Sequence, residues 1–167
     1  MFASRIEWRE RSSEEIFDRF EPSEWLKIFS DCESRESFEN FANAGFGKCW
    51  IAYDTEAAQP LAFIFIYTME NDSVAIFHGG GWSKQPTTNY ICMTTLLNKL
   101  FGMRYRIRTS CLRDNKVAFR FLHSVGFIKY RTEGNYDFLW LSEKRFKQSL
   151  IYQRFGEDRQ INKTLSK

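Results

Sequence analysis

The sequence predicts an α+β fold, a mixed sheet with flanking helices, and three observations support this prediction. Apolar residues recur at every second position in some segments, as in strands, and at every third or fourth position in others, as in helices. These segments follow the order β-α-α-β-β-β-α-β-α-β-β, without an internal repeat or a linker. The 167 residues are 43% hydrophobic, which is enough for one core. We therefore expect a single domain over residues 1–142, followed by a C-terminal helix and a polar tail over residues 143–167.

The first segments predict a strand followed by two helices. Apolar and charged residues alternate over residues 5–9, which favours a short strand. Ser12 is followed three residues later by Glu15, the spacing of a capping box, so a helix is expected over residues 12–20. A proline and a serine then end this helix and begin a second one over residues 22–43.

Three strands are expected next. Residues 49–53 and 61–67 favour strands, and the second is nearly all apolar, as in a strand covered on both faces. The polar turn at residues 70–72 leads to a returning strand over residues 74–77, which continues into Gly79–Gly81. Three successive glycines accept positive φ angles and let a ligand approach the backbone closely.

The next helix follows Pro86. Thr87 or Thr88 is expected to cap it, and Gly102 is expected to end it. A further strand follows, in which three apolar or hydroxyl side chains alternate with arginines: Arg104, Tyr105, Arg106, Ile107, Arg108 and Thr109.

The last part of the chain predicts a helix, a hairpin and a terminal helix. Asp114 or Asn115 caps the first of these helices, and Gly126 lies at its C-terminal end. The hairpin strands are expected over residues 127–132 and 136–141, and the terminal helix over residues 143–155.

The charge balance does not indicate a nucleic-acid partner. The net charge is +3, from 24 basic and 21 acidic residues. The arginines of the 104–108 row are expected on a solvated face, because no aromatic residue alternates with them on that face. No apolar run is long enough to cross a membrane, and the N-terminus has no signal-peptide pattern. We therefore expect a cytoplasmic protein without a membrane partner, and the sequence leaves its oligomeric state open.

The cysteines and histidines indicate neither disulfides nor a metal. Without a CxxC pair or a signal peptide, the cysteines are expected to be buried free thiols: Cys32, Cys49, Cys92 and Cys111. The two histidines, His78 and His123, have no metal-ligand spacing, so no metal site is expected.

One segment resembles a known family. Residues Asn115–Phe127 read NKVAFRFLHSVGF, which is similar to the Asn-x-x-Ala helix that ends in Gly-Phe in the GCN5-related N-acetyltransferase (GNAT) superfamily. The element order is also similar to that family over residues 5–141. The resemblance implies acetyl transfer from acetyl-coenzyme A, as a co-substrate, to an amine. It also implies that pantetheine lies where the fourth strand splays from the fifth, with the pyrophosphate at the N-terminus of the next helix.

The same resemblance implies the positions that bind the cofactor. The family's glycine-containing phosphate loop falls on Thr88–Met93, where none of its glycines is present and Ile91 and Met93 crowd the approach. The family's frequent tyrosine acid falls on Leu122, which cannot donate a proton. The cofactor-binding positions are then Gly80, Gly81, Trp82, Ser83, Thr88, Asn89, Tyr90, Ile91, Cys92, Met93 and Asn115.

The catalytic candidates are His78 and Ser110. An imidazole at residue 78 can accept the amine proton, and a hydroxyl at residue 110 can donate to the leaving thiolate. Each also has a purely structural interpretation: His78 as a hydrogen-bonded histidine within a strand, and Ser110 as a hydroxyl group at the end of a strand. Glu70 and Asp72 are possible carboxylate bases at a turn, and Cys111 is a possible nucleophile or a buried thiol.

Two functions remain open at this point. The first is an N-acetyltransferase for an amine of a small molecule or peptide, with backbone N–H groups near residues 80–83 holding the oxyanion. The alternative is a catalytically inactive module of the same fold that binds a protein or an acyl carrier. The glycine run and the Asn115 helix favour the enzyme, whereas the missing loop glycines and the leucine at residue 122 favour the module.

Overall fold

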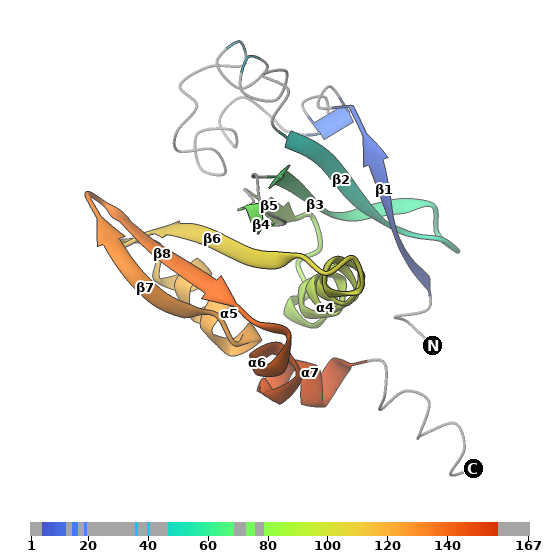
Figure 1. Cartoon of the computed structure of the whole chain (residues 1–167). Helices are drawn as coiled ribbons and strands as arrows, with labels where there is room; N and C mark the ends of the chain where they lie inside the picture. Colours follow the sequence, from blue (N-terminus) through green and yellow to red (C-terminus); the bar gives the residue numbers. More distant parts are fainter. Residues whose placement is uncertain are drawn as a thin grey trace.

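The described strands form one mixed sheet (Figure 1). The computed structural model describes residues 5–12, 15–16, 19, 36, 40, 47–68, 73–75 and 79–156. The sheet order is β1-β2-β3-β4-β6-β8-β7, and β5 pairs with β3. All neighbouring strands are antiparallel except β4 and β6. The strands are β1 Ile6–Arg11, β2 Gly47–Asp54, β3 Gln59–Thr68, β4 Ser73–Ala75, β5 Gly79–Gly81, β6 Arg106–Leu112, β7 Ile128–Glu133 and β8 Tyr136–Leu141.

The described helices pack against the sheet around one hydrophobic core. The helices are α4 Pro86–Gly102, α5 Lys116–Val125, α6 Glu143–Gln148 and α7 Leu150–Phe155. In Figure 1, α5, α6 and α7 lie below strands β6, β8 and β7. The core joins alternate residues of the strands, such as Ile64, Ile107 and Leu139, to buried helix residues such as Leu97 and Phe146. This burial supplies the apolar stabilisation that the composition predicts.

The predicted α+β architecture is confirmed, with a difference at the start of α4 and another in the terminal helix. Gln85 precedes α4 in an extended conformation and Pro86 is its first residue, so neither Thr87 nor Thr88 caps the helix. Proline suits this position because the amide it lacks has no partner within a helix. The predicted strand over residues 74–77 corresponds to β4 and the glycines form β5; both pair with β3, and residues 76–78 lie outside the described residues. The predicted helices over residues 12–20 and 22–43 and the turn at residues 70–72 lie largely or wholly outside the described residues.

The terminal helix is divided in two, which the sequence analysis did not predict. Ser149 is extended, with φ −68° and ψ 151°, and separates α6 from α7. Its Oγ accepts a hydrogen bond from the backbone N–H of Tyr152 at 3.1 Å, so Ser149 caps α7. A serine inside a helical pattern competes for backbone donors in this way.

The described cysteines are buried free thiols, as predicted; Cys32 lies outside the described residues. Burial raises the pKa of Cys49 and of Cys92 to about 12. Both side chains are therefore neutral packing groups at physiological pH.

No helix in the part of the chain that the structure describes is both long and apolar enough to span a bilayer.

The junction of β1 with the end of β2 gives a pH-dependent prediction. The Arg5 guanidinium donates to both Asp54 carboxylate oxygens, at 3.2 and 2.6 Å, and the backbone N–H of Glu56 also donates to Asp54. The hydrogen bond from Arg5 is the main reason that the pKa of Asp54 lies below its usual value. A lowered folded-state pKa stabilises the protein above the ordinary pKa of about 3.9, and this contribution is lost as the pH falls through the folded value.

We expect Asp54→Asn to lower the melting temperature at pH 7 and the difference to shrink as the pH falls below the ordinary aspartate pKa of about 3.9. Thermal unfolding followed by circular dichroism across this range measures the difference. The control is Glu56→Gln, which removes the exposed second partner of Arg5 and is expected to have a smaller effect. A constant difference between wild type and Asp54→Asn at every pH would contradict this account.

Candidate active site

The sheet divides between β5 and β6. At the start of β6, β4 pairs with Arg106 and Ile107. Further along, β5 pairs with β3, and residues 109–112 of β6 pair with β8. No pairing joins β5 to β6 among the described residues, so an opening lies between these strands. This is the splay that the resemblance implied.

In β5, the strand of glycines, the backbone N–H and C=O groups of alternate residues point into this opening. The Trp82 N–H donates to the Leu61 carbonyl at 2.9 Å, and the same register sets Gly80 opposite Phe63. Because hydrogen bonding alternates along an antiparallel pair, the N–H and C=O of Gly81 are directed away from β3 and toward the opening. Of the oxyanion donors predicted over residues 80–83, only the N–H of Gly81 therefore remains. The N–H groups of Trp82 and Ser83 both donate to the Leu61 carbonyl, and Gly80 faces β3.

These glycines are needed for space rather than for an unusual backbone angle. A Cβ on Gly79 would lie 2.9 Å from the Phe63 carbonyl oxygen, and a Cβ on Gly81 would overlap the Asn89 amide. The described glycines with positive φ are elsewhere, at Gly126 and Gly134. The close approach of β3 and α4 therefore explains the glycine run.

A cleft of about 410 Å³ follows the opening between α4 and α5. Seven of the predicted site residues line it: Gly80, Gly81, Asn89, Cys92, Met93, Ser110 and Asn115. The sequence analysis did not connect the cleft with β1 or β8, yet Trp8 and Tyr136 also line it. Only the pairing of Leu112 with Tyr136 brings the latter beside β6, and no local pattern reveals that pairing.

The other predicted cofactor-binding residues do not line the cleft. Tyr90 stacks on Phe121 with ring centroids 4.8 Å apart, and its hydroxyl bonds Ser124 at 3.3 Å. The Trp82 ring packs on Phe63. The remaining three are Ser83, whose Oγ accepts from Gln85 N–H, and the buried residues Thr88 and Ile91. These side chains hold α4 and the strand end in place.

The segment that precedes α4 differs from the prediction. Residues 88–93 are helical rather than a loop, and Trp82–Gln85 form the connection from β5. Ile91 and Met93 therefore lie beyond the first turn and do not crowd its amides. The start of α4 has no side-chain cap and no acidic residue, and the exposed Lys84 precedes it. The N–H groups of Thr88 and Asn89 donate to the Gln85 carbonyl, so this helix N-terminus favours an anion mainly through its dipole and the basic residue before it.

Asn89 connects this helix start to the glycine strand. Its Nδ2 donates to the Ser83 carbonyl at 3.3 Å. Its Oδ1 is buried and has no hydrogen-bond partner among the described residues. A buried acceptor without a partner is unfavourable, so a ligand donor in the cleft would relieve a cost already present in the protein.

The α5 helix begins and ends as the sequence predicts. Asn115 is its N-cap, and the side-chain oxygen accepts from the Ala118 N–H at 3.0 Å. Gly126 ends the helix in the left-handed conformation, with φ 108°. Leu122 is buried and lines the cleft, and its apolar side chain offers no acid there.

The remaining predicted residues fall outside the site or outside the described residues. His78, Glu70 and Asp72 belong to segments that the structure does not describe. His123 is exposed and stacks on Phe119, with ring centroids 6.4 Å apart. Among the described residues, no group of histidine, cysteine or acidic side chains is arranged to bind a metal.

Cys111 lines the cleft but is not activated. Burial is the main cause that raises the pKa of its thiol, and Asp137 adds to the shift. Its Sγ donates to the Leu112 and Asn115 carbonyls at 3.4 and 3.6 Å. A neutral thiol held in this way is a poor nucleophile.

Comparison with solved structures identifies the fold. No protein-family model and no curated protein matches the chain. An uncharacterized protein from Bacillus halodurans matches 92% of this chain and 91% of its own, with a TM-score of 0.70 and 10% identity. The aminoglycoside acetyltransferase AAC(6')-Ib, in complex with coenzyme A and kanamycin, matches 86% of this chain and 98% of its own, with a TM-score of 0.67 and 11% identity. The Campylobacter jejuni N-acetyltransferase PseH, in complex with acetyl-coenzyme A, matches 83% of this chain and 99% of its own, with a TM-score of 0.60 and 16% identity.

The chain therefore has the fold of the GCN5-related N-acetyltransferases, in a divergent form. The fold that the sequence resemblance implied is confirmed.

Proposed function

We propose that the protein transfers an acetyl group from acetyl-coenzyme A to an amine of a small molecule or peptide. The observation that carries this proposal is the cleft at the division of the sheet, which lies beside an uncapped helix start. The same fold occurs in acetyltransferases whose structures contain acetyl-coenzyme A or coenzyme A.

The residues around the cleft fit acetyl-coenzyme A. The outward C=O of Gly81 and the unpartnered Oδ1 of Asn89 are acceptors that match the amide N–H groups of pantetheine. The start of α4, with Lys84 before it, suits the pyrophosphate. Asn115 caps α5 at the other side of the cleft.

The chemistry that these residues support is mainly positioning. An amine aligned with the thioester carbonyl gains most of its rate from proximity. The Gly81 N–H would stabilise the developing oxyanion. Ser110 is our candidate hydroxyl for protonating a departing thiolate, and the hydroxyl side chains of Thr109 and Tyr136 also line the cleft. His78 remains our candidate for the base, with water as the substitute.

The alternative is a binding module that uses the cleft without catalysis. The observation that favours it is Leu122, an apolar side chain where the family resemblance places an acid. Calorimetry with acetyl-coenzyme A, followed by release of free coenzyme A with a panel of amines, separates the two. Binding without release would support the module, and release would support the enzyme.

The start of α4 gives a direct test of cofactor binding. We expect acetyl-coenzyme A at about 100 times its dissociation constant to raise the melting temperature by about 5–10 °C. Thr87→Asp adds a carboxylate to the exposed first turn, where it stabilises the helix dipole but repels pyrophosphate. This variant is therefore expected to keep or raise the melting temperature of the free protein while it loses most of the ligand-induced shift.

The matched control is Gln148→Glu, which adds the same charge at an exposed residue of α6. It is expected to keep the full ligand-induced shift. Equal shifts in wild type, Thr87→Asp and Gln148→Glu would contradict pyrophosphate binding at α4.

A further inference from the structure

The face of the sheet opposite the described helices α4, α5, α6 and α7 carries a row of aromatic and cationic side chains. In β6 and β8, Arg108 pairs with Trp140, Ser110 with Phe138, and Leu112 with Tyr136. In β7, Arg131 pairs with Phe138. We call this surface the aromatic–arginine face and define it by Arg108, Tyr130, Arg131, Tyr136, Phe138 and Trp140.

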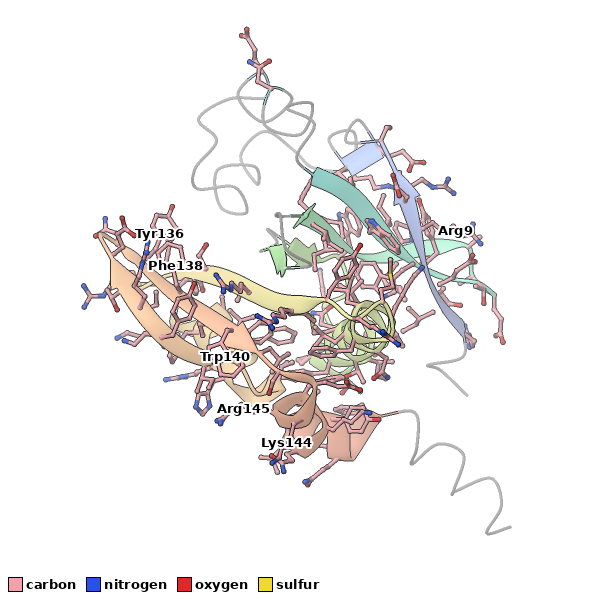
Figure 2. The ribbon with its side chains drawn as sticks, in the orientation of Figure 1. Arg9, Tyr136, Phe138, Trp140, Lys144 and Arg145 are labelled. Carbon is pink, nitrogen blue, oxygen red and sulfur yellow. The ribbon has the colours of Figure 1, made fainter. Side chains whose placement is uncertain are left out.

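Alternation along the strands separates this face from the core. Ile107, Leu139 and Leu141 point to the other side, where they pack with the helices. Trp140 and Tyr130 retain 39% and 49% of their surface in solvent. Figure 2 shows Tyr136, Phe138 and Trp140 following one another along β8, with Arg145 and Lys144 beyond Trp140.

Cations are interleaved with the rings. The Arg131 guanidinium lies 4.8 Å from the Phe138 ring centroid, and the Arg108 guanidinium lies 5.9 Å from that of Tyr130. Arg106 precedes Arg108 on the same side of β6 and is exposed. On β7, Glu133 is an acid on this face, and it is paired with Arg131. Among the described residues, the face therefore has an excess of positive charge, although the whole chain is nearly balanced.

The spacing and the number of the rings indicate the ligand. Side chains two residues apart on a strand are separated by roughly 7 Å, so Phe138 and Trp140 place two rings one such step apart along β8. A single nucleotide has one base and would occupy one of them. An acidic peptide would pair with the arginines but would leave the rings unused, and a polycationic ligand would be repelled. A polyanion with regularly spaced aromatic bases uses both features.

We propose that the aromatic–arginine face binds single-stranded nucleic acid, with bases stacked along β8 and phosphates near Arg106, Arg108 and Arg131. This binding goes beyond acetyl transfer and does not depend on it. Ser110, Leu112 and Tyr136 belong to this side of the sheet and also line the cleft, so a strand bound along the row leads toward the cleft.

The test uses the full chain without acetyl-coenzyme A. Fluorescence anisotropy follows a labelled single-stranded RNA of about 12 nucleotides, within the length that one such sheet surface covers. We expect binding that weakens as salt is raised. Trp140→Ala is expected to weaken it at least about fivefold through lost stacking. Arg108→Gln is expected to reduce the slope of log affinity against log salt by about 0.7.

Matched controls come from the other side of the molecule. Arg120→Gln removes an exposed cation of α5, and Leu150→Ala removes an exposed apolar side chain of α7. Neither is expected to change RNA affinity, and melting temperatures of all four variants verify folding. The proposal is overturned if no binding occurs at low salt, or if the controls weaken binding as much as Trp140→Ala. It is also overturned if uridine diphosphate or a duplex of the same sequence competes as well as the single strand.

Discussion

Replacing Leu122 by tyrosine is expected to raise kcat by up to about 100-fold, the typical contribution of a positioned acid. Leu122 lines the cleft and cannot protonate a departing thiolate. Because a thiolate with a pKa near ~8.5 is a fairly good leaving group, the wild-type reaction is expected to be slow rather than blocked. Tyr90 is not a substitute acid, because its ring packs on Phe121 and its side chain does not line the cleft.

The tyrosine side chain is larger than leucine and is expected to lower the stability of the fold. A matched variant separates this effect from the effect on the reaction rate. Leu122 also belongs to the core, so a tyrosine there is expected to destabilise the fold by about 1–3 kcal/mol. Leu122→Phe adds the same ring without the hydroxyl and is expected to lose similar stability without a gain in kcat. Single-turnover rates and melting temperatures of both variants give the comparison. If Leu122→Tyr folds and its rate equals that of Leu122→Phe, residue 122 is not the vacant acid position.

Gly81→Ala is expected to weaken acetyl-coenzyme A binding about tenfold, equal to ~1.4 kcal/mol. The new methyl group would overlap the Asn89 amide, which must then move and release the Ser83 carbonyl. Because that amide also lines the cleft, the same movement disturbs the ligand site. We expect a loss of about 1–3 kcal/mol in stability, as for other overpacked positions.

A second substitution identifies the cause of this loss. If the overlap with Asn89 is responsible, adding Asn89→Ala to Gly81→Ala should recover stability relative to Gly81→Ala alone. Gly102→Ala is the control, because a Cβ there has no neighbour within 4 Å. Melting temperatures and calorimetric titrations test both effects. Additive losses in the double variant would show that Gly81 and Asn89 do not act on each other.

Local signals in the sequence correctly predicted most of the described elements. The α5 helix is the clearest case, because Asn115 offers a side-chain acceptor to the first turn and Gly126 tolerates the left-handed conformation. The division at Ser149 was missed because its hydroxyl competes with a helical pattern that is otherwise continuous. The start of α4 was misplaced because the threonines have capping chemistry, whereas Pro86 already determines the first turn.

The candidate site was only partly predictable for the same reason. Gly81, Asn89, Ser110 and Asn115 were predicted and line one cleft. Which amides of the glycine strand face the opening depends on the register with β3, and that register is not visible in residues 79–83 alone. The contribution of Tyr136 depends on its pairing with Leu112, from a distant part of the chain.

The sequence by itself determined the order of elements, the alternation of buried and exposed positions, and the caps of α5, because each depends on neighbours within a few residues. Only the tertiary structure decided what surrounds the arginines of β6. Along the chain no aromatic residue shares their face of the strand, and they were expected on a plain solvated face. Strand β8 lies between β6 and β7 and sets Trp140 opposite Arg108, because cross-strand neighbours are chosen by pairing and not by proximity in the sequence.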